Sequence, residues 1–258
     1  MSNRLISSVA AAAMLLTAGA PAFGAKRPAP RADGNLVWRD EFDGPRLDAT
    51  KWSHRGLGPR KGGVNVAEAV TLDGQGHLVL TTSKVGEKYH TGMIGTQGKL
   101  ERALGYFECR VKLQRQLGHW SAFWLQSPKL GKVLGDTKRS GTEIDIFEYL
   151  SRRGETIQHT LHWDGYGKAH KSSGKTPRVT GLTKGWHTVG LEWTKDEYVF
   201  YVDGKVTWRT RQAVSHTPQY IILSLEVGSW AGKIADATLP DRVLFDYVRV
   251  YKTRPSSP

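Results

Sequence analysis

Three acidic side chains that lie within six residues of one another are best suited to chemistry in this sequence. The stretch SGTEIDIFEYL carries Glu143, Asp145 and Glu148 among β-branched and aromatic residues that are typical of a strand. Side chains of a strand alternate between its two faces, so Glu143 and Asp145 share a face and Glu148 should point to the other. A β-bulge at Ile146 or Phe147 resets the alternation, because two residues then oppose one on the partner strand. With that bulge, all three carboxylates face one groove.

Carboxylates that share a face repel one another, so a fold that groups them is expected to use them. Two chemistries compete: binding of a hard cation by carboxylate oxygens, and glycoside hydrolysis by a nucleophile and an acid/base, which in retaining enzymes lie about 5–5.5 Å apart. Glu143 and Glu148 are four effective strand steps apart, roughly 13 Å at about 3.3 Å per residue, so a concave, twisted sheet must close the gap. Asp145 between them can share a proton with Glu143. The third interpretation, acids on a solvated strand face, fits poorly with the aromatic neighbours.

The elements that must position these acids read as short strands separated by turn signals. Besides the acidic stretch, the expected strands include LVWRDEF, HLVLTTS, GYFECRVKLQ, SAFWLQS, TIQHTLHW, WHTVGLEWT, EYVFYVDGKVTWRT, YIILSLEV and RVLFDYVRVY. The pair Asp203-Gly204 predicts a two-residue hairpin turn. We find no long helical period in the mature chain. The sequence therefore predicts one all-β sandwich or barrel over residues 36–252.

The ends of the chain carry signals of export rather than of folding. An apolar, Ala-rich run follows Arg4 and ends in PAFGA, whose small residues are spaced as a signal-peptidase site. We expect a signal peptide over residues 1–24, a Pro- and charge-rich linker over residues 25–35 and a tail over residues 253–258. The apolar run is too short for a membrane-spanning helix. The predicted localisation is secreted, either extracellular or periplasmic.

Composition excludes several other classes of protein. The only cysteine, Cys109, rules out a disulfide framework within one chain, and its strand context predicts a small buried hydrophobe. The formal net charge of +13 invites anionic partners, but the basic residues are scattered through loops without a nucleic-acid-binding signature. We expect a monomer with a solvated basic surface that binds neither nucleic acid nor membrane. If the three acids hydrolyse glycosides, its partner is a polysaccharide.

The acidic stretch resembles the bulged E-x-D-x-x-E motif of glycoside hydrolase family 16, in its laminarinase- and agarase-like subgroup. The resemblance covers nearly the whole mature chain, through VWRDEFDGPRLDATKW, GYFECRVKL, GHWSAFWLQ, GWHTVGLEWTKDEYVFYVDGK and FDYVRVY. It implies a concanavalin-like β-jelly-roll sandwich of two antiparallel sheets with a concave substrate cleft, and a retaining, endo-acting hydrolase without a catalytic cofactor. By the same resemblance, Glu143 matches the nucleophile, Asp145 the assisting acid and Glu148 the general acid/base.

The resemblance also implies residues that bind the sugar. Trp120 matches an aromatic residue that supports a sugar ring, a role that suits the apolar face of an indole. We expect its neighbour Trp124, in the apolar AFWL run, to pack in the core instead. His162 and Trp163, in LHWDGYG, match the strand after the catalytic one, with His162 expected in the cleft near Glu148. The segment WDGYGKAHKSSGKTP is expected to form a loop over the cleft.

One segment departs from the family pattern. Where the family often has Asn followed by Gly-Gly and Trp, this chain has SLEVGSWAG, with Glu226 near the Asn and Ser229 replacing a glycine. Trp230 is expected to line the cleft, and Glu226 is either an extra cleft acid or a rim residue. The departure leaves the sugar specificity open.

Metal sites are considered separately from catalysis. Members of the family often hold one structural calcium ion on the convex side, and the matching positions are Glu41 and Gly76, through backbone carbonyls, and the Asp246 side chain. Oxygen ligands of this kind suit Ca²⁺; the alternative is that Asp246 only caps a strand end. A zinc pair is not expected, because His159 and His162 are three residues apart on a strand and point to opposite faces.

The leading functional hypothesis is a secreted retaining endo-glycosidase that hydrolyses a β-1,3- or mixed β-1,3/1,4-glucan, the commonest substrates of the family. The alternative enzyme is a hydrolase of red-algal galactans of the agarose, porphyran or carrageenan type. A non-catalytic carbohydrate-binding jelly roll needs the aromatic residues but not the three acids, and a basic polyanion-binding protein needs the charge but not the groove. The intact trio of acids favours an enzyme.

Overall fold

The structure is a computed structural model that describes residues 27–30 and 35–255. The expected signal peptide lies outside the described residues, as do most of the expected linker and the last three residues of the expected tail. Among the residues that are described, none belongs to a helix with the length and apolarity needed to cross a bilayer.

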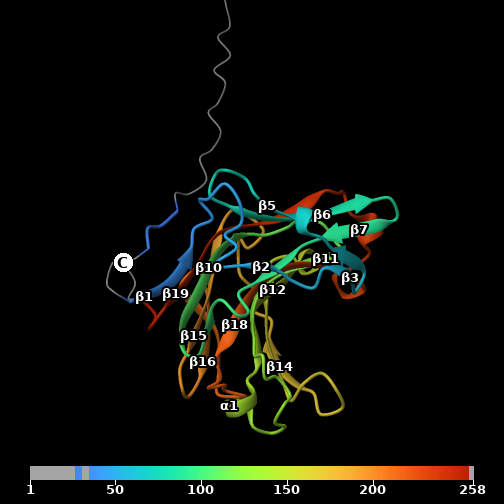
Figure 1. Cartoon of the computed structure of the whole chain (residues 1–258). Helices are drawn as coiled ribbons and strands as arrows, with labels where there is room; N and C mark the ends of the chain where they lie inside the picture. The colour runs from blue at the N-terminus through green and yellow to red at the C-terminus, as the bar shows by residue number, and fades with distance from the viewer. Residues whose placement is uncertain (1–26, 31–34, 256–258) are drawn as a thin grey trace, which may run out of the picture.

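Two β-sheets make up the fold (Figure 1). In spatial order, the first contains β17 (Lys205–Thr210), β16 (Tyr198–Val202), β15 (His187–Trp193), β10 (Gly105–Lys112), β19 (Asp241–Tyr251), β6 (Leu78–Val85), β7 (Lys88–Thr91), β4 (Gly63–Asn65) and β3 (Gly58–Arg60), with β1 (Leu36–Asp40) paired to β19 and β5 (Val70–Leu72) paired to β6. Its pairs are antiparallel except β4 with β7.

The second sheet carries the acidic stretch near its centre. Its order is β14 (Lys171–Lys175), β13 (Gln158–Trp163), β12 (Glu143–Leu150), β11 (His119–Gln126), β18 (Gln219–Val227), β8 (Met93–Gly95) and β2 (Ser53–His54), with β9 (Glu101–Arg102) paired to β18. Helical turns are short: α1 (Thr137–Ser140), η1 (Ala67–Ala69), η2 (Ser151–Arg153), η3 (Ser229–Ala231) and η4 (Ile234–Asp236). The predicted all-β sandwich of two antiparallel sheets is confirmed.

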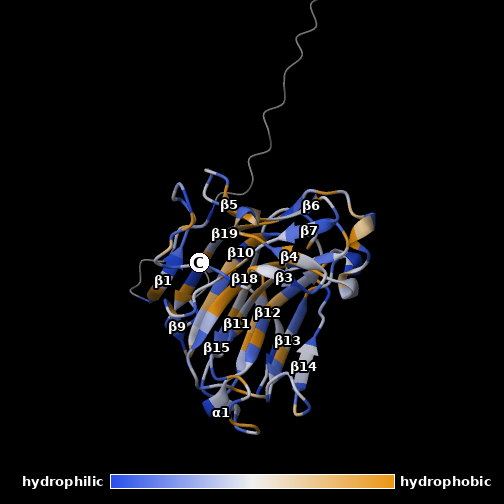
Figure 2. Cartoon of the chain, turned by 45° about the vertical axis from the view of Figure 1, so that its right-hand side comes forward, coloured by the Kyte–Doolittle hydropathy of each residue, from blue (hydrophilic) through white to orange (hydrophobic). Residues whose placement is uncertain are grey.

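The main hydrophobic core lies between the two sheets. It joins alternate residues of β10 and β19, such as Phe107 and Phe245, to Ile144 of β12 and Leu223 of β18, all fully buried. Figure 2 shows the hydrophobic residues in orange along these central strands. Cys109 also lies in this core, as predicted, and its burial raises the pKa of the thiol. Burial of one face of each sheet leaves the other face of β11, β12 and β18 available for a site.

Local sequence signals account for most of the strands. The predicted hairpin turn is confirmed, since Asp203 and Gly204 have φ of 48° and 75° and Val202 pairs with Lys205. Positive φ at both central positions is the geometry that Asp-Gly favours. Residues 163–177 were expected to form a loop over the cleft. Only part of this segment is a loop, because Lys171–Lys175 forms the edge strand β14.

Candidate active site

A β-bulge in β12 brings the three acids to one face. Between Asp145 and Glu148, β12 has two residues where β13 has only His159. On the other side, the pairing with β11 skips Ile146 alone, so Ile146 is the added residue, and it is fully buried in the core. The bulge re-aims the next polar side chain, and Glu148 lines the same cavity as Glu143 and Asp145. The predicted bulge is therefore present.

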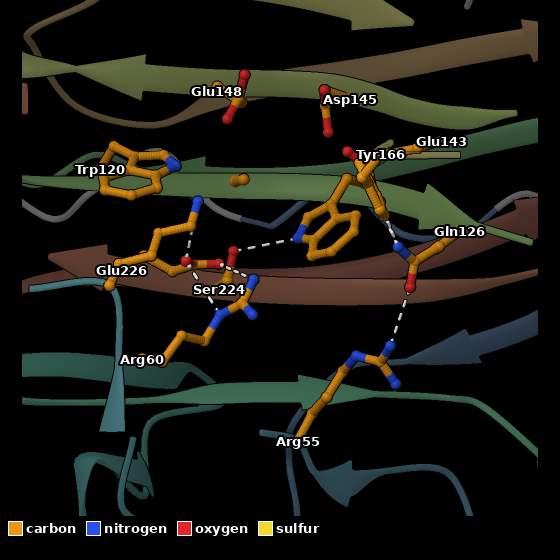
Figure 3. Close-up of a pocket in the computed structure, with 13 residues that line it drawn as sticks. Arg55, Arg60, Trp120, Gln126, Glu143, Asp145, Glu148, Tyr166, Ser224 and Glu226 are labelled. Atoms are coloured by element: carbon orange, nitrogen blue, oxygen red, sulfur yellow. Dashed lines mark hydrogen bonds and ion pairs between the residues drawn. The ribbon is translucent and has the colours of Figure 1, made fainter. Parts of the chain in front are cut away.

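The cavity over this face has a volume of about 330 Å³ (Figure 3). One wall is the acidic strand, and the floor is formed by alternate residues of β11, namely Trp120, Ala122, Trp124 and Gln126. The opposite wall carries three basic residues from the segment between β2 and β4: Arg55, Arg60 and Lys61. An acidic wall thus faces a basic one across an aromatic floor.

Burial determines the protonation of two of the acids. Asp145 is 4% exposed, and its burial, followed by the charges of Glu143 and Glu226, raises the pKa of its carboxyl well above the usual range. The pKa of Glu148 is raised for the same reasons, first by burial and then by the charges of Asp145 and Glu143. A carboxyl with a raised pKa keeps its proton to higher pH than a free carboxyl does and can donate it as a general acid.

Glu143 is held by two hydrogen bonds to one oxygen. Its Oε2 accepts from Gln126 Nε2 at 3.0 Å and from the hydroxyl of Tyr166. The Gln126 amide also donates to the Tyr166 hydroxyl at 2.7 Å. Sequence reasoning missed Tyr166 and Gln126, although a tyrosine between two glycines in a segment expected over the cleft was a usable signal for Tyr166.

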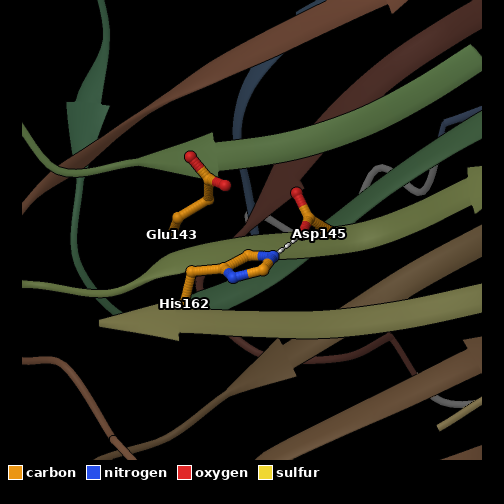
Figure 4. Close-up of side chains that lie close together, drawn as sticks. All are labelled: Glu143, Asp145 and His162. Atoms are coloured by element: carbon orange, nitrogen blue, oxygen red, sulfur yellow. Dashed lines mark ion pairs between the residues drawn. The ribbon is translucent and has the colours of Figure 1, made fainter. Parts of the chain in front are cut away.

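His162 lies in the site, but at the other end from the one expected. It pairs in register with Glu143 rather than with Glu148, and its Nε2 is 3.4 Å from Asp145 Oδ2 (Figure 4). Its Nδ1 is 2.9 Å from His170 Nε2, and the two rings stack. The antiparallel register explains the difference, because β13 runs past Glu148 before it reaches His162.

One atom each from Glu143, Asp145 and His162 lies within 4.8 Å of the others, a grouping that in principle suits a metal ion. Strand alternation alone places Glu143 and Asp145 on one face, so the grouping does not distinguish metal binding from hydrolysis. His159 points the opposite way, as expected, and is fully buried in the core.

The tryptophans divide differently from the expectation. Trp120 lines the cavity, with Lys61 Nζ 4.5 Å from its ring centre and Trp230 packed edge-on at 5.1 Å. Trp124 packs in a smaller hydrophobic cluster with Met93 and Tyr220, outside the main core, and also lines the cavity, where its Nε1 donates to Ser224 Oγ at 3.1 Å. Strand alternation explains the position of Trp124, because residues four apart on a strand point to the same face and Trp120 faces the cavity.

Alternation also explains Trp163. It directly follows His162, so it points to the opposite face of β13 and packs against the main core. The structure therefore does not place Trp163 in the cavity, in contrast to the expectation for a sugar-binding residue.

Glu226 is an inner residue of the cavity and not a rim residue. It is 4% exposed, accepts from Arg60 Nε and Nη2 at 3.1 Å each, and lies 3.4 Å from Lys61 Nζ. Two of the three basic residues of the facing wall are thereby paired with a carboxylate.

Arg55 has a different set of partners. It donates to Gln97 Oε1 at 2.7 Å, Gln126 Oε1 at 2.9 Å and Tyr220 Oη at 2.8 Å, all of which are uncharged. Its guanidinium also lies 4.8 Å from the centre of the Tyr220 ring.

The residues expected to bind calcium do not fit that ion as they are arranged here. Asp246 is 1% exposed, and its two oxygens accept from Arg27 Nε at 2.6 Å and Arg110 Nη1 at 2.5 Å. Arg27 also donates to the carbonyl oxygen of Gly76 and lies 3.6 Å from the Glu41 carboxylate. A guanidinium therefore joins the three chain segments that a calcium ion was expected to join.

Comparisons with known proteins agree with the fold and identify the family. The family described as glycosyl hydrolases family 16 matches residues 62–249. The chain is 29% identical to the keratan-sulfate endo-1,4-beta-galactosidase of Sphingobacterium multivorum, over 85% of this chain and 56% of that protein. It is 30% identical to the glucan endo-1,3-beta-glucosidase A1 of Niallia circulans, over 84% of this chain and 38% of that protein. The chain thus spans about half or less of the length of these two relatives.

Solved structures with the same architecture include glucanases. The laminarinase of Flavobacterium sp. UMI-01 superposes with a TM-score of 0.72 at 26% identity, covering 84% of this chain and 99% of that one. SCLam, a non-specific endo-beta-1,3(4)-glucanase from family GH16, superposes with a TM-score of 0.71 at 30% identity, covering 90% of this chain and 96% of that one.

Proposed function

Because the chain belongs to glycosyl hydrolase family 16, we propose that it is a secreted retaining endo-glycosidase that hydrolyses internal bonds of a β-1,3- or mixed β-1,3/1,4-glucan. The observation that carries the proposal is the grouping of three carboxyls in one cavity by the bulge. The raised pKa of Glu148 suits a proton donor, and the hydrogen bonds to one oxygen of Glu143 suit an oriented nucleophile.

The reaction follows in two steps. Glu143 attacks the anomeric carbon, the bond to the leaving oxygen breaks, and Glu148 gives that oxygen its proton. Glu148, now a carboxylate, takes a proton from a water molecule that attacks the same carbon and releases Glu143. Two inversions give net retention of the β configuration. The raised pKa of Asp145 favours its neutral form, which limits repulsion on the face that it shares with Glu143.

The floor of the cavity suits a sugar chain. Trp120 and Trp124 line the cavity along β11, although little of either side chain is exposed and Lys61 lies over the Trp120 ring. Apolar faces of pyranose rings pack on the exposed parts of such rings. Support for a glucan comes from the glucanases among the similar structures.

A second candidate substrate is a β-galactan, including one that carries anionic groups. The specific observation is the basic wall of Arg55, Arg60 and Lys61, in which the side-chain acceptors of Arg55 among the described residues are all uncharged. The similarity to the keratan-sulfate endo-1,4-beta-galactosidase supports the same alternative.

A panel of polymers tests the proposal. The exported protein is incubated with laminarin, lichenan, agarose, porphyran, carrageenan and keratan sulfate, and new reducing ends are measured, with Glu148→Gln as the control. Release from laminarin or lichenan supports a glucanase, whereas release from a galactan alone favours the second candidate. Tight binding to a polymer without any cleavage contradicts an enzyme and indicates a carbohydrate-binding module. Amino-terminal sequencing of the exported protein tests the expected cleavage after Gly24.

A further inference from the structure

Tyr166 reaches the buried Glu143 from the surface. It lies in the 164–170 loop, the residues between β13 and β14, and the residue is 62% exposed. Its hydroxyl nevertheless donates to Glu143 Oε2, while Glu143 itself is only 9% exposed. Figure 3 shows the Tyr166 hydroxyl beside the Glu143 carboxylate, on the Gln126 side of the cavity. An exposed ring thus ends in a hydrogen bond to the proposed nucleophile.

The loop that carries Tyr166 is fixed at its start. Asp164 is 3% exposed and accepts from Gly135 N at 2.8 Å and from Lys171 Nζ at 2.9 Å. The backbone of Gly165 packs closely on Gly131, where an added Cβ would come within 2.7 Å of Gly165 Cα. These contacts hold the base of the loop against the 127–142 segment and fix the direction in which Tyr166 leaves it.

The second donor to Glu143 is also fixed. Arg55 Nη2 and the Tyr220 hydroxyl both donate to Gln126 Oε1, at 2.9 Å and 2.5 Å. An amide oxygen with two donors must leave the NH₂ group of Gln126 facing Glu143 and Tyr166. The orientation of the Gln126 amide is thus set by groups behind it, so both donors to Oε2 are in place before a substrate binds.

We propose that Tyr166, together with Gln126, positions the Glu143 carboxylate by holding Oε2, so that Oε1 attacks the anomeric carbon. The inference rests on the proposed role of Glu143 as nucleophile. Among the described residues, no hydrogen bond to Oε1 accompanies the two to Oε2. Fixing one oxygen of a carboxylate selects the other for attack and reduces the rotational freedom that must be lost in the transition state.

The hydrogen bond from Tyr166 to Glu143 Oε2 acts in both steps of the reaction. When Oε1 bonds to the anomeric carbon, Oε2 becomes the carbonyl oxygen of the glycosyl ester. When water attacks that carbon, the bond to Oε1 breaks and its electron pair returns to the carboxylate. A donor on Oε2 stabilises the returning charge. Burial and the charge of Glu143 raise the pKa of the Tyr166 phenol, so it remains a donor at any working pH.

Tyr166→Phe tests the inference because it keeps the ring and removes only the donor. The substrate is a dinitrophenyl oligoglycoside of the sugar that the polymer panel identifies, since its leaving group needs no acid and the second step becomes limiting. We expect kcat to fall about 10- to 100-fold, the effect of losing one hydrogen bond to a charged group. KM should stay within about threefold or fall, as it does when an intermediate accumulates, and a pre-steady-state burst should appear.

Two comparisons separate positioning from other roles. Lys168→Ala alters an exposed residue of the same loop and should leave kcat and KM unchanged. A Tyr166→Phe protein with wild-type kcat and an increased KM would show only a substrate contact and would overturn the inference. If Glu143→Gln is inactive while Tyr166→Phe matches the wild type, positioning by Tyr166 is wrong and the proposed function stands. If Glu143→Gln remains active, the proposed function itself is wrong.

Discussion

His159 Nδ1 lies 2.7 Å from the carbonyl oxygen of Ile146, the residue that the bulge adds to the catalytic strand. A bulge leaves its extra residue without a regular ladder partner, and the imidazole supplies a hydrogen bond in its place. His159 Nε2 is 2.9 Å from Thr207 Oγ1, so both ring nitrogens have partners on the core side. A neutral ring that donates from Nδ1 satisfies the Ile146 carbonyl, and the Thr207 hydroxyl, which also contacts the Phe200 carbonyl oxygen, can share its hydrogen with Nε2. The core face of β13 thereby stabilises the bend that groups the carboxyls on the cavity face.

The buried His159 should make stability depend on acid pH. Burial lowers its pKa from 6.5 to about 4, so between these values the unfolded chain binds a proton that the folded chain does not. The free energy of unfolding should therefore decrease as pH falls through this window, by up to about 3 kcal/mol from this group. Urea unfolding at several pH values measures the decrease.

The variant His159→Gln should flatten that dependence, whereas His216→Gln, at an exposed histidine, should not. The acids with raised pKa, Asp145 and Glu148, act in the opposite direction, since they favour the folded state as pH falls. An unchanged pH dependence in His159→Gln would show that this imidazole is not the group responsible.

Substitution of the acids should separate their roles. Glu143→Gln and Glu148→Gln should each lower kcat about 1,000-fold or more with the fold intact, because each removes half of a double displacement. Asp145→Asn should lower kcat by a smaller factor, because Asp145 influences the protonation of the site but forms no bond to the substrate. Initial rates on the cleaved polymer, with circular dichroism as the check on folding, provide the comparison.

The dependence of activity on pH should report the ionisation of Glu148. Since burial raises the pKa of Glu148, its proton is available below that pKa and lost above it. Activity should therefore fall on the alkaline limb as Glu148 ionises. Retention of that limb in a Glu148→Gln protein assayed with a dinitrophenyl glycoside, which needs no acid, would assign the limb to another group.

Arg27 should contribute to stability in the place where calcium was expected. Arg27→Ala removes the bond to Asp246 Oδ1 and the link to Gly76, and should destabilise the fold by about 1 kcal/mol, or lower Tm by about 2–4 °C. Arg46→Ala, at an exposed arginine, is the matched control. Thermal melting with calcium and with a chelator should give the same Tm for the wild-type protein. A wild-type Tm that falls by several degrees with chelator would instead support a bound ion.

The response to salt should distinguish the two substrate classes. The basic wall of Arg55, Arg60 and Lys61 attracts an anionic chain over distances that salt screens within about 8–10 Å. Raising the salt concentration should increase KM several-fold for a sulfated galactan, and should change kcat/KM less than about twofold for a neutral glucan. Desulfated and sulfated forms of one polymer are the matched substrates. If salt changed kcat/KM strongly with laminarin, which is uncharged, attraction of an anionic chain could not be the cause of the salt dependence.

The sequence predicted those features that depend on local alternation. The bulge between Asp145 and Glu148 followed from the need to place three acids on one face, and the strand pairing contains it. The same rule, applied to Trp163 and Trp124, would have placed the first in the core and the second in the cavity. The expectations for these two residues came from family position and from apolar neighbours. The structure differs from the first, and it bears out the second only in part, because Trp124 is buried in a smaller cluster and also lines the cavity.

Contacts between distant segments were beyond the sequence patterns. Gln126 and Tyr166 meet at Glu143 only because β11 and the 164–170 loop lie on either side of β12. Arg27, in the expected linker, contacts Asp246 across 219 residues, and no periodicity or spacing encodes that contact. Composition correctly suggested a basic surface, but not that Arg60 and Lys61 pair with Glu226 inside the cavity.

The stereochemistry of the first product tests the central claim most directly. Proton NMR of the anomeric signals, recorded during hydrolysis of whichever polymer is cleaved, shows which anomer appears before mutarotation. A double displacement by Glu143 and Glu148 predicts that the β anomer appears first and the α anomer grows in later. Initial appearance of the α anomer would contradict the assignment of Glu143 as a nucleophile.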